Sequence, residues 1–165
     1  MNNLTIGLFG TCGNSKWREP FIREFQKRDI CYYNPQVNNW TPDNETQEAW
    51  HLANDDIILF PITDETYGLG SLAETGYGIL HVLQSEKERS IILYIAPLPN
   101  ERLKKNHEVW EESRRARALV LAHLEKIKNP NIHIASSLKH MFDLSLMVKR
   151  ESFVDSTISS REEQR

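Results

Sequence analysis

The sequence predicts an α/β protein with three layers, in which an open five-stranded parallel sheet lies between helices on both faces, as in flavodoxin-like and Rossmann-like folds. Short apolar runs alternate along the chain with longer segments whose apolar residues recur at helical spacing. The run at 56–62 is apolar almost throughout, as expected of a strand covered on both faces. Repeated strand–helix units favour right-handed crossovers and therefore a parallel sheet.

The first elements follow from short runs and their end signals. Residues 4–9 are an apolar run that ends at Gly10, which is typical of a short strand. Residues 17–28 carry apolar side chains at helical spacing. Residues 30–33 are a second strand-like run, and Pro35 ends it.

The middle of the chain predicts a helix, a strand and a second helix. Residues 43–54 are expected to be helical, with Thr41 as a cap and Pro42 at the first position. Residues 56–62 form the buried strand. Residues 71–84 continue as a helix.

The last part of the domain repeats the alternation. A strand is expected at 90–96, one long helix at 101–128, a strand at 131–135 and a helix at 137–150. Residues 1–150 therefore read as a single domain. The remaining segment, 151–165, is polar and is expected to be a fraying tail.

Charge and composition narrow the function classes. A net charge of −3 argues against binding of a nucleic acid polymer through a basic surface. The basic cluster Arg114, Arg115 and Arg117 is expected to be a solvated helix face. No apolar run is long enough to cross a membrane, and the first residues lack the features of a signal peptide. Two cysteines are too few for a disulfide framework or a zinc site. We therefore expect a cytoplasmic protein with reduced thiols.

The segment 67–77 (YGLGSLAETGY) is the most informative part of the chain. It places Glu74 at the junction of a predicted parallel strand and a helix, among several glycines that are costly in a helix. A carboxylate at such a junction is well placed to act as a nucleophile or an acid/base. An alternative is that Ser71 and Glu74 form a capping box at the start of the helix.

Three loops are expected to meet at the carboxyl ends of the strands, where ligands bind in such folds. The loop 11–16 suits an anion or sugar hydroxyls, although it is neither a Walker loop nor a complete GxGxxG motif. The loop 34–42 is rich in amides that suit a base edge or a sugar. The loop 63–71 brings further acidic side chains and a tyrosine, a plausible acid/base set.

Each loop also has an ordinary explanation. The first loop is equally well a plain strand–helix turn, in which Cys12 is a small loop residue. If the loop does bind a ligand, Ser15, Lys16 and Arg18 leave a phosphate contact open. The residues of the second loop are better explained by a polar connection in which Trp40 covers the core instead of stacking on a base. The acidic residues of the third loop match no metal-ligand spacing, so no metal is expected.

The sequence resembles the nucleoside 2-deoxyribosyltransferase family. The residues that carry the resemblance are the run DDIILF at 55–60, the pair Asp64-Glu65, the step Gly68-Leu69-Gly70 and the motif Glu74-Thr75-Gly76-Tyr77-Gly78. The segments LFGTCGNSKWR and NPQVNNWTP are similar to the deoxyribosyltransferase-like branch of that family. The resemblance covers about residues 4–95, and the motif around Glu74 is its most specific part.

The resemblance implies an open parallel sheet and transfer of 2-deoxyribose between nucleobases without a cofactor or metal. It implies that Glu74 is the nucleophile, that Glu48 handles the leaving base and that Asp64 is a further acidic group. The expected substrate contacts are Thr11, Cys12, Asn14, Gln36, Trp40, Tyr67, Gly70 and Ser71. The implied ligands are deoxynucleosides or deoxynucleotides and free bases, and the implied assembly is a homo-oligomer.

The chemistry of the residue types agrees with this interpretation. Cleavage of an N-glycosidic bond passes through an oxocarbenium-like sugar, which a carboxylate can stabilise or attack while a second acid protonates the departing base. Two other interpretations remain open. Attack by water would make the protein a nucleoside or nucleotide hydrolase, and binding without turnover would make it a nucleotide-sensing domain.

Overall fold

The computed structural model describes residues 4–39 and 41–162, with side chains described as far as residue 150. Its five strands form one sheet in the order β2-β1-β3-β4-β5, and every adjacent pair is parallel. The strands are β1 (Ile6–Leu8), β2 (Tyr32–Tyr33), β3 (Ile57–Ile62), β4 (Ser90–Ile95) and β5 (Ile132–Ile134). The order is that of flavodoxin-like proteins. The predicted fold class is therefore confirmed.

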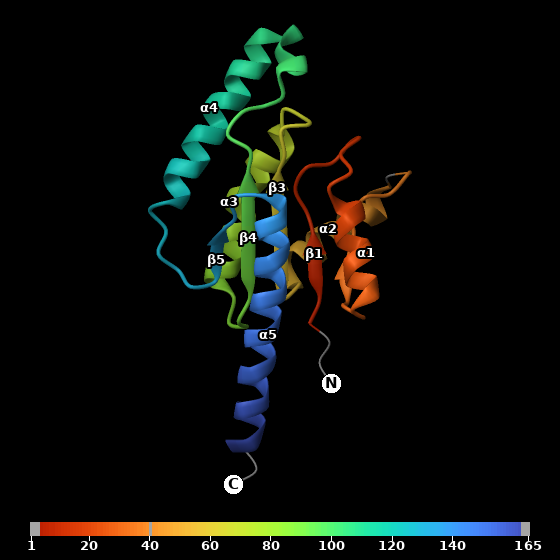
Figure 1. Cartoon of the computed structure of the whole chain (residues 1–165), viewed down its shortest axis with the longest axis vertical. Coiled ribbons are helices and arrows are strands. Elements are labelled where there is room, and N and C mark those ends of the chain that lie inside the picture. Colours follow the sequence, from red (N-terminus) through yellow and green to blue (C-terminus); the bar gives the residue numbers. More distant parts are fainter. Residues whose placement is uncertain (1–3, 40, 163–165) are drawn as a thin grey trace.

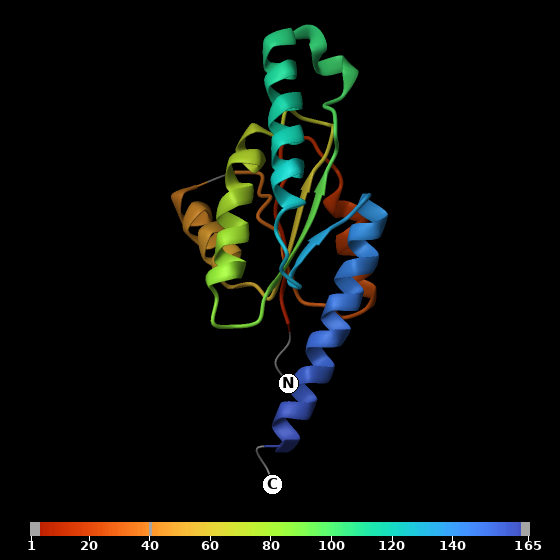
Figure 2. The ribbon, with the colours of Figure 1, turned by 90° about the vertical axis from the view of Figure 1, so that its left-hand side faces the viewer.

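Helices cover both faces of this sheet, as Figures 1 and 2 show from two sides. The helices are α1 (Arg18–Lys27), α2 (Pro42–Asn54), α3 (Leu69–Gln84), the 3₁₀ helix η1 (Glu101–Lys105), α4 (His107–Leu124) and α5 (Leu138–Glu162). Buried residues of α1 and α5 pack on one face, and those of α2, α3 and α4 pack on the other. None of the described helices is both long and apolar enough to cross a membrane.

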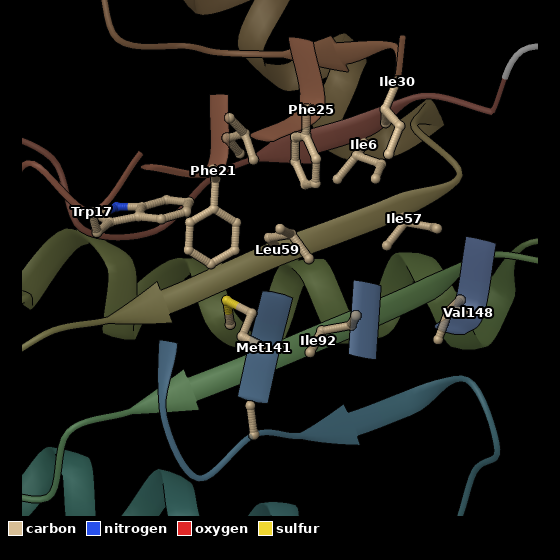
Figure 3. Close-up of a cluster of buried hydrophobic side chains, with 12 residues drawn as sticks. Ile6, Trp17, Phe21, Phe25, Ile30, Ile57, Leu59, Ile92, Met141 and Val148 are labelled. Atoms are coloured by element: carbon tan, nitrogen blue, oxygen red, sulfur yellow. The ribbon is translucent and has the colours of Figure 1, made fainter. Parts of the chain in front are cut away.

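The core on the α1 and α5 face is built from aromatic rings over the central strands. Figure 3 shows Phe21 and Phe25 of α1 pointing toward Leu59 of β3, with Met141 of α5 beside them. The Phe25 ring stacks on that of Phe142, with the ring centroids 5.6 Å apart. Because these side chains come from both ends of the chain, burial of this cluster ties α5 to the N-terminal half of the domain.

Three helix predictions differ from the structure. The single helix expected at 101–128 is divided at Asn106, whose side chain accepts a hydrogen bond from the backbone N–H of Val109 and caps α4. Helix α5 does not end at residue 150 but continues to Glu162, so the expected polar tail is helical over 151–162. Helix α3 begins at Leu69, two residues before the predicted start.

The capping prediction for α2 is confirmed, whereas that for α3 is wrong. Thr41 and Asn44 form a reciprocal capping box at the start of α2, with Pro42 at the first helical position. In α3 the cap residue is Gly68, which has a left-handed backbone, and Ser71 lies inside the helix. Glu74 is therefore in the second turn of α3, too far along the helix to close a capping box.

Candidate functional site

A cavity of about 680 Å³ opens at the carboxyl ends of β1 and β3. Strand order reverses between these two strands, because β2 lies on one side of β1 and β3 lies on the other. Ligands of open α/β sheets bind at this kind of switch point, and the volume is typical of small-molecule sites. The cavity is lined by Gly10, Cys12, Gly13, Pro35, Gln36, Val37, Glu48, Thr66, Tyr67, Gly68, Leu69, Gly70, Ser71 and Glu74. The three predicted loops therefore do converge on one cavity.

Two carboxylates line this cavity from different helices. Glu48 comes from the middle of α2, and Glu74 comes from the second turn of α3. No hydrogen bond or ion pair within the described part of the chain engages either carboxylate, so both remain available to a ligand. Helical periodicity alone could not have singled out Glu48 as the residue that faces the cavity, because α2 carries several acidic residues along its length.

The surroundings of both carboxylates favour their protonated forms. Glu74 is an exposed residue whose carboxylate is partly desolvated beside the cavity; this desolvation raises its pKa, and the negative charge of Glu48 raises it further. Burial also raises the pKa of Glu48, while the guanidinium of Arg18 acts in the opposite direction. Two carboxyl groups that repel each other lose their protons in separate steps. Two such groups can present one acid and one anion to the same ligand.

The backbone of the first loop is held by the buried side chain of Arg18. Its Nε donates to the carbonyl of Leu8 at 2.9 Å, and its Nη1 donates to the carbonyl of Thr11 at 2.6 Å. Ser15 is also buried and donates to the Glu65 carboxylate. Of the three residues that left a phosphate contact open, only Lys16 is exposed. Arg18 therefore shapes the loop, and it also lines a smaller hollow beside the loop.

Only some of the predicted substrate contacts of the first two loops line the cavity, and Thr11 does not. Cys12 lines the cavity and is exposed, whereas Thr11 is buried and donates to the carbonyl of Pro61 at 3.1 Å. Asn14 lines a smaller hollow next to the cavity. Gln36 borders both spaces, and its side chain donates to the carbonyl of Gly13 at 3.0 Å. Trp40 lies outside the described residues.

The third loop contributes a ring and a helix start but not its predicted acid. Tyr67, Gly70 and Ser71 line the cavity as expected, and the Tyr67 hydroxyl donates to the carbonyl of Leu103 at 2.8 Å. Asp64 does not line the cavity. Its carboxylate accepts a hydrogen bond of 3.1 Å from the side chain of Asn100, so it joins the loop to the segment after β4.

The prediction of a solvated helix face is wrong for Arg117. This residue is fully buried, and its guanidinium donates to backbone carbonyls around the third loop. A signal for this placement exists in the sequence. The buried residues of α4 are spaced three, four and seven residues apart, which is the spacing of one helical face; they are Trp110, Ser113, Arg117 and Leu124.

The described residues contain no group of three or more His, Cys, Asp or Glu side chains that could hold a metal ion. Cys12 and Cys31 are both free thiols. Comparison of the chain with protein-family models, with curated proteins and with solved structures gave no match.

Proposed function

We propose that this protein cleaves the N-glycosidic bond of a 2-deoxynucleoside and transfers the deoxyribosyl group to another nucleobase. The observation that carries this proposal is the placement of two carboxylates, Glu74 and Glu48, in one cavity at the switch point of the sheet, with no partner among the described residues. Retention-type glycosyl transfer requires this combination, because one carboxylate attacks the sugar while one acid protonates the leaving group.

The proposed reaction has two steps. In the first, a carboxylate oxygen of Glu74 bonds to the anomeric carbon as the bond from that carbon to the base nitrogen breaks. The bonding electrons leave with the base, and Glu48 supplies the proton that the base takes up. In the second step, the nitrogen of a new base attacks the anomeric carbon, the ester to Glu74 breaks, and Glu48 recovers a proton from the incoming base.

The electrostatics of the pair support a division into acid and anion, and the resemblance to deoxyribosyltransferases supplies the assignment of roles. Both pKa values are raised, so a proton is available within the cavity at higher pH than for a solvated glutamate. The resemblance places the nucleophile at Glu74 and the acid at Glu48. The sugar lacks a 2-hydroxyl group in this substrate class and therefore forms the cationic transition state more readily.

The lining of the cavity favours a nucleoside over an anionic ligand such as a nucleotide. None of the described residues that line it is lysine or arginine, whereas two are glutamates. The ring of Tyr67 and the backbone of the glycine-rich turn offer surfaces for a base and a sugar. Lys16 and Arg18 line the adjoining hollow, outside the cavity that holds the carboxylates.

A turnover assay with two arms tests this proposal. Deoxynucleosides are incubated with and without a free acceptor base, and the products are separated by chromatography. Base exchange that requires the acceptor supports transfer, whereas free deoxyribose without an acceptor would support hydrolysis. Binding with neither product would support a sensing domain.

Variants of the two glutamates connect the assay to the site. Glu74→Gln and Glu48→Gln should each abolish most base exchange. Glu45→Gln is the matched control, because Glu45 is exposed on the same helix as Glu48 and does not line the cavity. Base exchange near the parent level in Glu74→Gln would contradict the proposed mechanism.

The proposal extends to assembly and location. The outer face of α3, defined by Leu69, Tyr77, Leu80 and Leu83, is apolar, and each of these side chains is between 46% and 54% exposed. Helix α3 has no lysine, arginine or aspartate, and Leu69 also lines the cavity. A second copy seated on this face would cover apolar surface at the cavity mouth. Free thiols are consistent with a cytoplasmic site of action.

A further inference from the structure

Arg117 of α4 is a fully buried cation whose side chain is directed at backbone carbonyls. Its Nη1 donates to the carbonyls of Ile62 and Ala96 at 3.1 and 2.9 Å, which lie at the ends of β3 and β4. Its Nη2 donates to the carbonyls of Thr63 and Thr66 at 2.9 and 3.0 Å. The guanidinium therefore joins the ends of two strands to the loop that leads into α3.

Ser113 lies one turn before Arg117 on the same buried face of α4 and completes this arrangement. Its hydroxyl donates to the carbonyl of Tyr67 at 2.6 Å and accepts a hydrogen bond of 3.2 Å from Nε of Arg117. At the other end of Tyr67, the side-chain hydroxyl donates to the carbonyl of Leu103. Both ends of Tyr67 are thus held by the segment that contains η1 and α4.

Two of the residues whose carbonyls Arg117 and Ser113 hold, Thr66 and Tyr67, line the cavity. Gly68 also lines it and is the cap from which α3 begins. Gly68 has a φ of +68°, and a Cβ atom at this position would lie 3.1 Å from Nη2 of Arg117 and 2.8 Å from the Ile62 side chain. The turn is therefore pressed against the guanidinium, with no room for a larger residue.

The position of Glu74 follows from this turn. Glu74 lies in the second turn of α3, so a shift of the first turn moves its carboxylate relative to Glu48. The geometry requires an arginine. A guanidinium has five N–H donors in a fixed fork, whereas a lysine ammonium has three on a flexible stem and cannot reach the same set of carbonyls.

We infer that Arg117 and Ser113 are positioning residues, which hold the 66–68 turn so that Tyr67 and Glu74 face the cavity in register with Glu48. The effect on catalysis rests on the proposed function, whereas the effect on the turn rests on the hydrogen bonds alone. Figures 1 and 2 show that η1 and the first half of α4 rise above the ends of the strands, where they can brace this loop.

Hydrogen exchange read by mass spectrometry tests the effect on the turn without any assay of activity. We expect amide exchange over residues 66–74 to be faster in Arg117→Met and in Ser113→Ala than in the parent, with the rest of the sheet unchanged. Arg114→Met is the matched control, since Arg114 pairs with Glu111 at the side of the same helix. Ser113→Ala carries the test if Arg117→Met does not fold, because it removes a single hydroxyl.

Kinetics then test the effect on catalysis. A misplaced catalytic group lowers kcat by about a hundredfold in Arg117→Met and about tenfold in Ser113→Ala, with KM changed much less. Arg117→Lys should recover only part of kcat. Unchanged exchange over residues 66–74 in a folded Arg117→Met or Ser113→Ala variant would overturn the inference, as would a KM effect without a kcat effect. Faster local exchange in a protein whose parent form has no turnover would support the positioning of the turn and refute the proposed reaction.

Discussion

Gly10 provides a quantitative test of the way in which β1 and β3 build the cavity. Its φ is +82°, which costs a residue with a side chain about 1–2 kcal/mol. A Cβ atom at this position would also press against the Pro61 carbonyl and lie 2.9 Å from the Pro61 nitrogen. The end of β1 would then have to move away from β3.

That movement would break the hydrogen bond of 2.8 Å from the Thr11 N–H to the Pro61 carbonyl, which contributes about 1 kcal/mol. Gly10→Ala should therefore lower the free energy of unfolding by about 2–3 kcal/mol, the combined size of the backbone strain and the lost hydrogen bond. For a chain of this length the corresponding fall in Tm is about 4–12 °C.

Thermal and urea unfolding followed by circular dichroism measure this change. Gly76→Ala is the control, because Gly76 is exposed in α3 and an added Cβ would meet nothing within 4 Å. It should stabilise the protein by up to about 1 kcal/mol, as alanine favours a helix interior. A Gly10→Ala protein that unfolds with the parent's midpoint would refute the described contact between β1 and β3.

Three further predictions concern charge, assembly and the core. The raised pKa of Glu74 means that its contribution to stability, present below the ordinary pKa of 4.5, is lost as pH rises through the folded-state value. Urea unfolding at pH 4.5 and pH 7 should therefore show a larger loss of stability for the parent than for Glu74→Gln, and an equal loss would contradict the direction of the shift. Leu80→Glu on the outer face of α3 should reduce the molar mass of the assembly measured by light scattering. Met147→Glu is the control, because Met147 is exposed on α5, and it should leave the mass unchanged. An assembly of unchanged mass in Leu80→Glu would exclude the outer face of α3 as the interface. Phe25→Ala should lower the free energy of unfolding by about 3–5 kcal/mol, because the ring is fully buried in the aromatic cluster. Urea unfolding measures this change, and a value below about 1 kcal/mol would be inconsistent with the packing.

The sequence was sufficient for the fold because its periodicity is local. Apolar runs and helical spacing are properties of neighbouring residues, so strand and helix order, and with them the meeting of three loops, could be predicted. The ends of helices were harder to predict from the sequence where a single polar side chain determines them. The division at Asn106 depends on one side-chain cap, within a stretch whose composition is helical on both sides.

The site was only partly accessible for a different reason. Thr11 and Asp64 carry the right chemistry and lie in the right loops, but their hydrogen bonds are with Pro61 and Asn100, far along the chain. Such long-range partners leave no local pattern. Arg117 is the opposite case, because a local signal did exist. Its spacing relative to other buried residues of α4 indicated a position on the inward face, whereas its charge indicated a position in solvent. For a buried cation, the supply of backbone carbonyls at the ends of β3 and β4 decided its position.

A covalent adduct on Glu74 is the most direct test of the proposed function. The parent protein is incubated with a 2-deoxynucleoside in the absence of an acceptor base, quenched in acid, digested and examined by mass spectrometry. We expect a peptide that contains Glu74 to gain the mass of one deoxyribosyl group, and the same peptide from Glu74→Gln to remain unmodified. Base exchange that proceeds with no adduct on this peptide, or with an adduct on another residue, would contradict the assignment of Glu74 as the nucleophile.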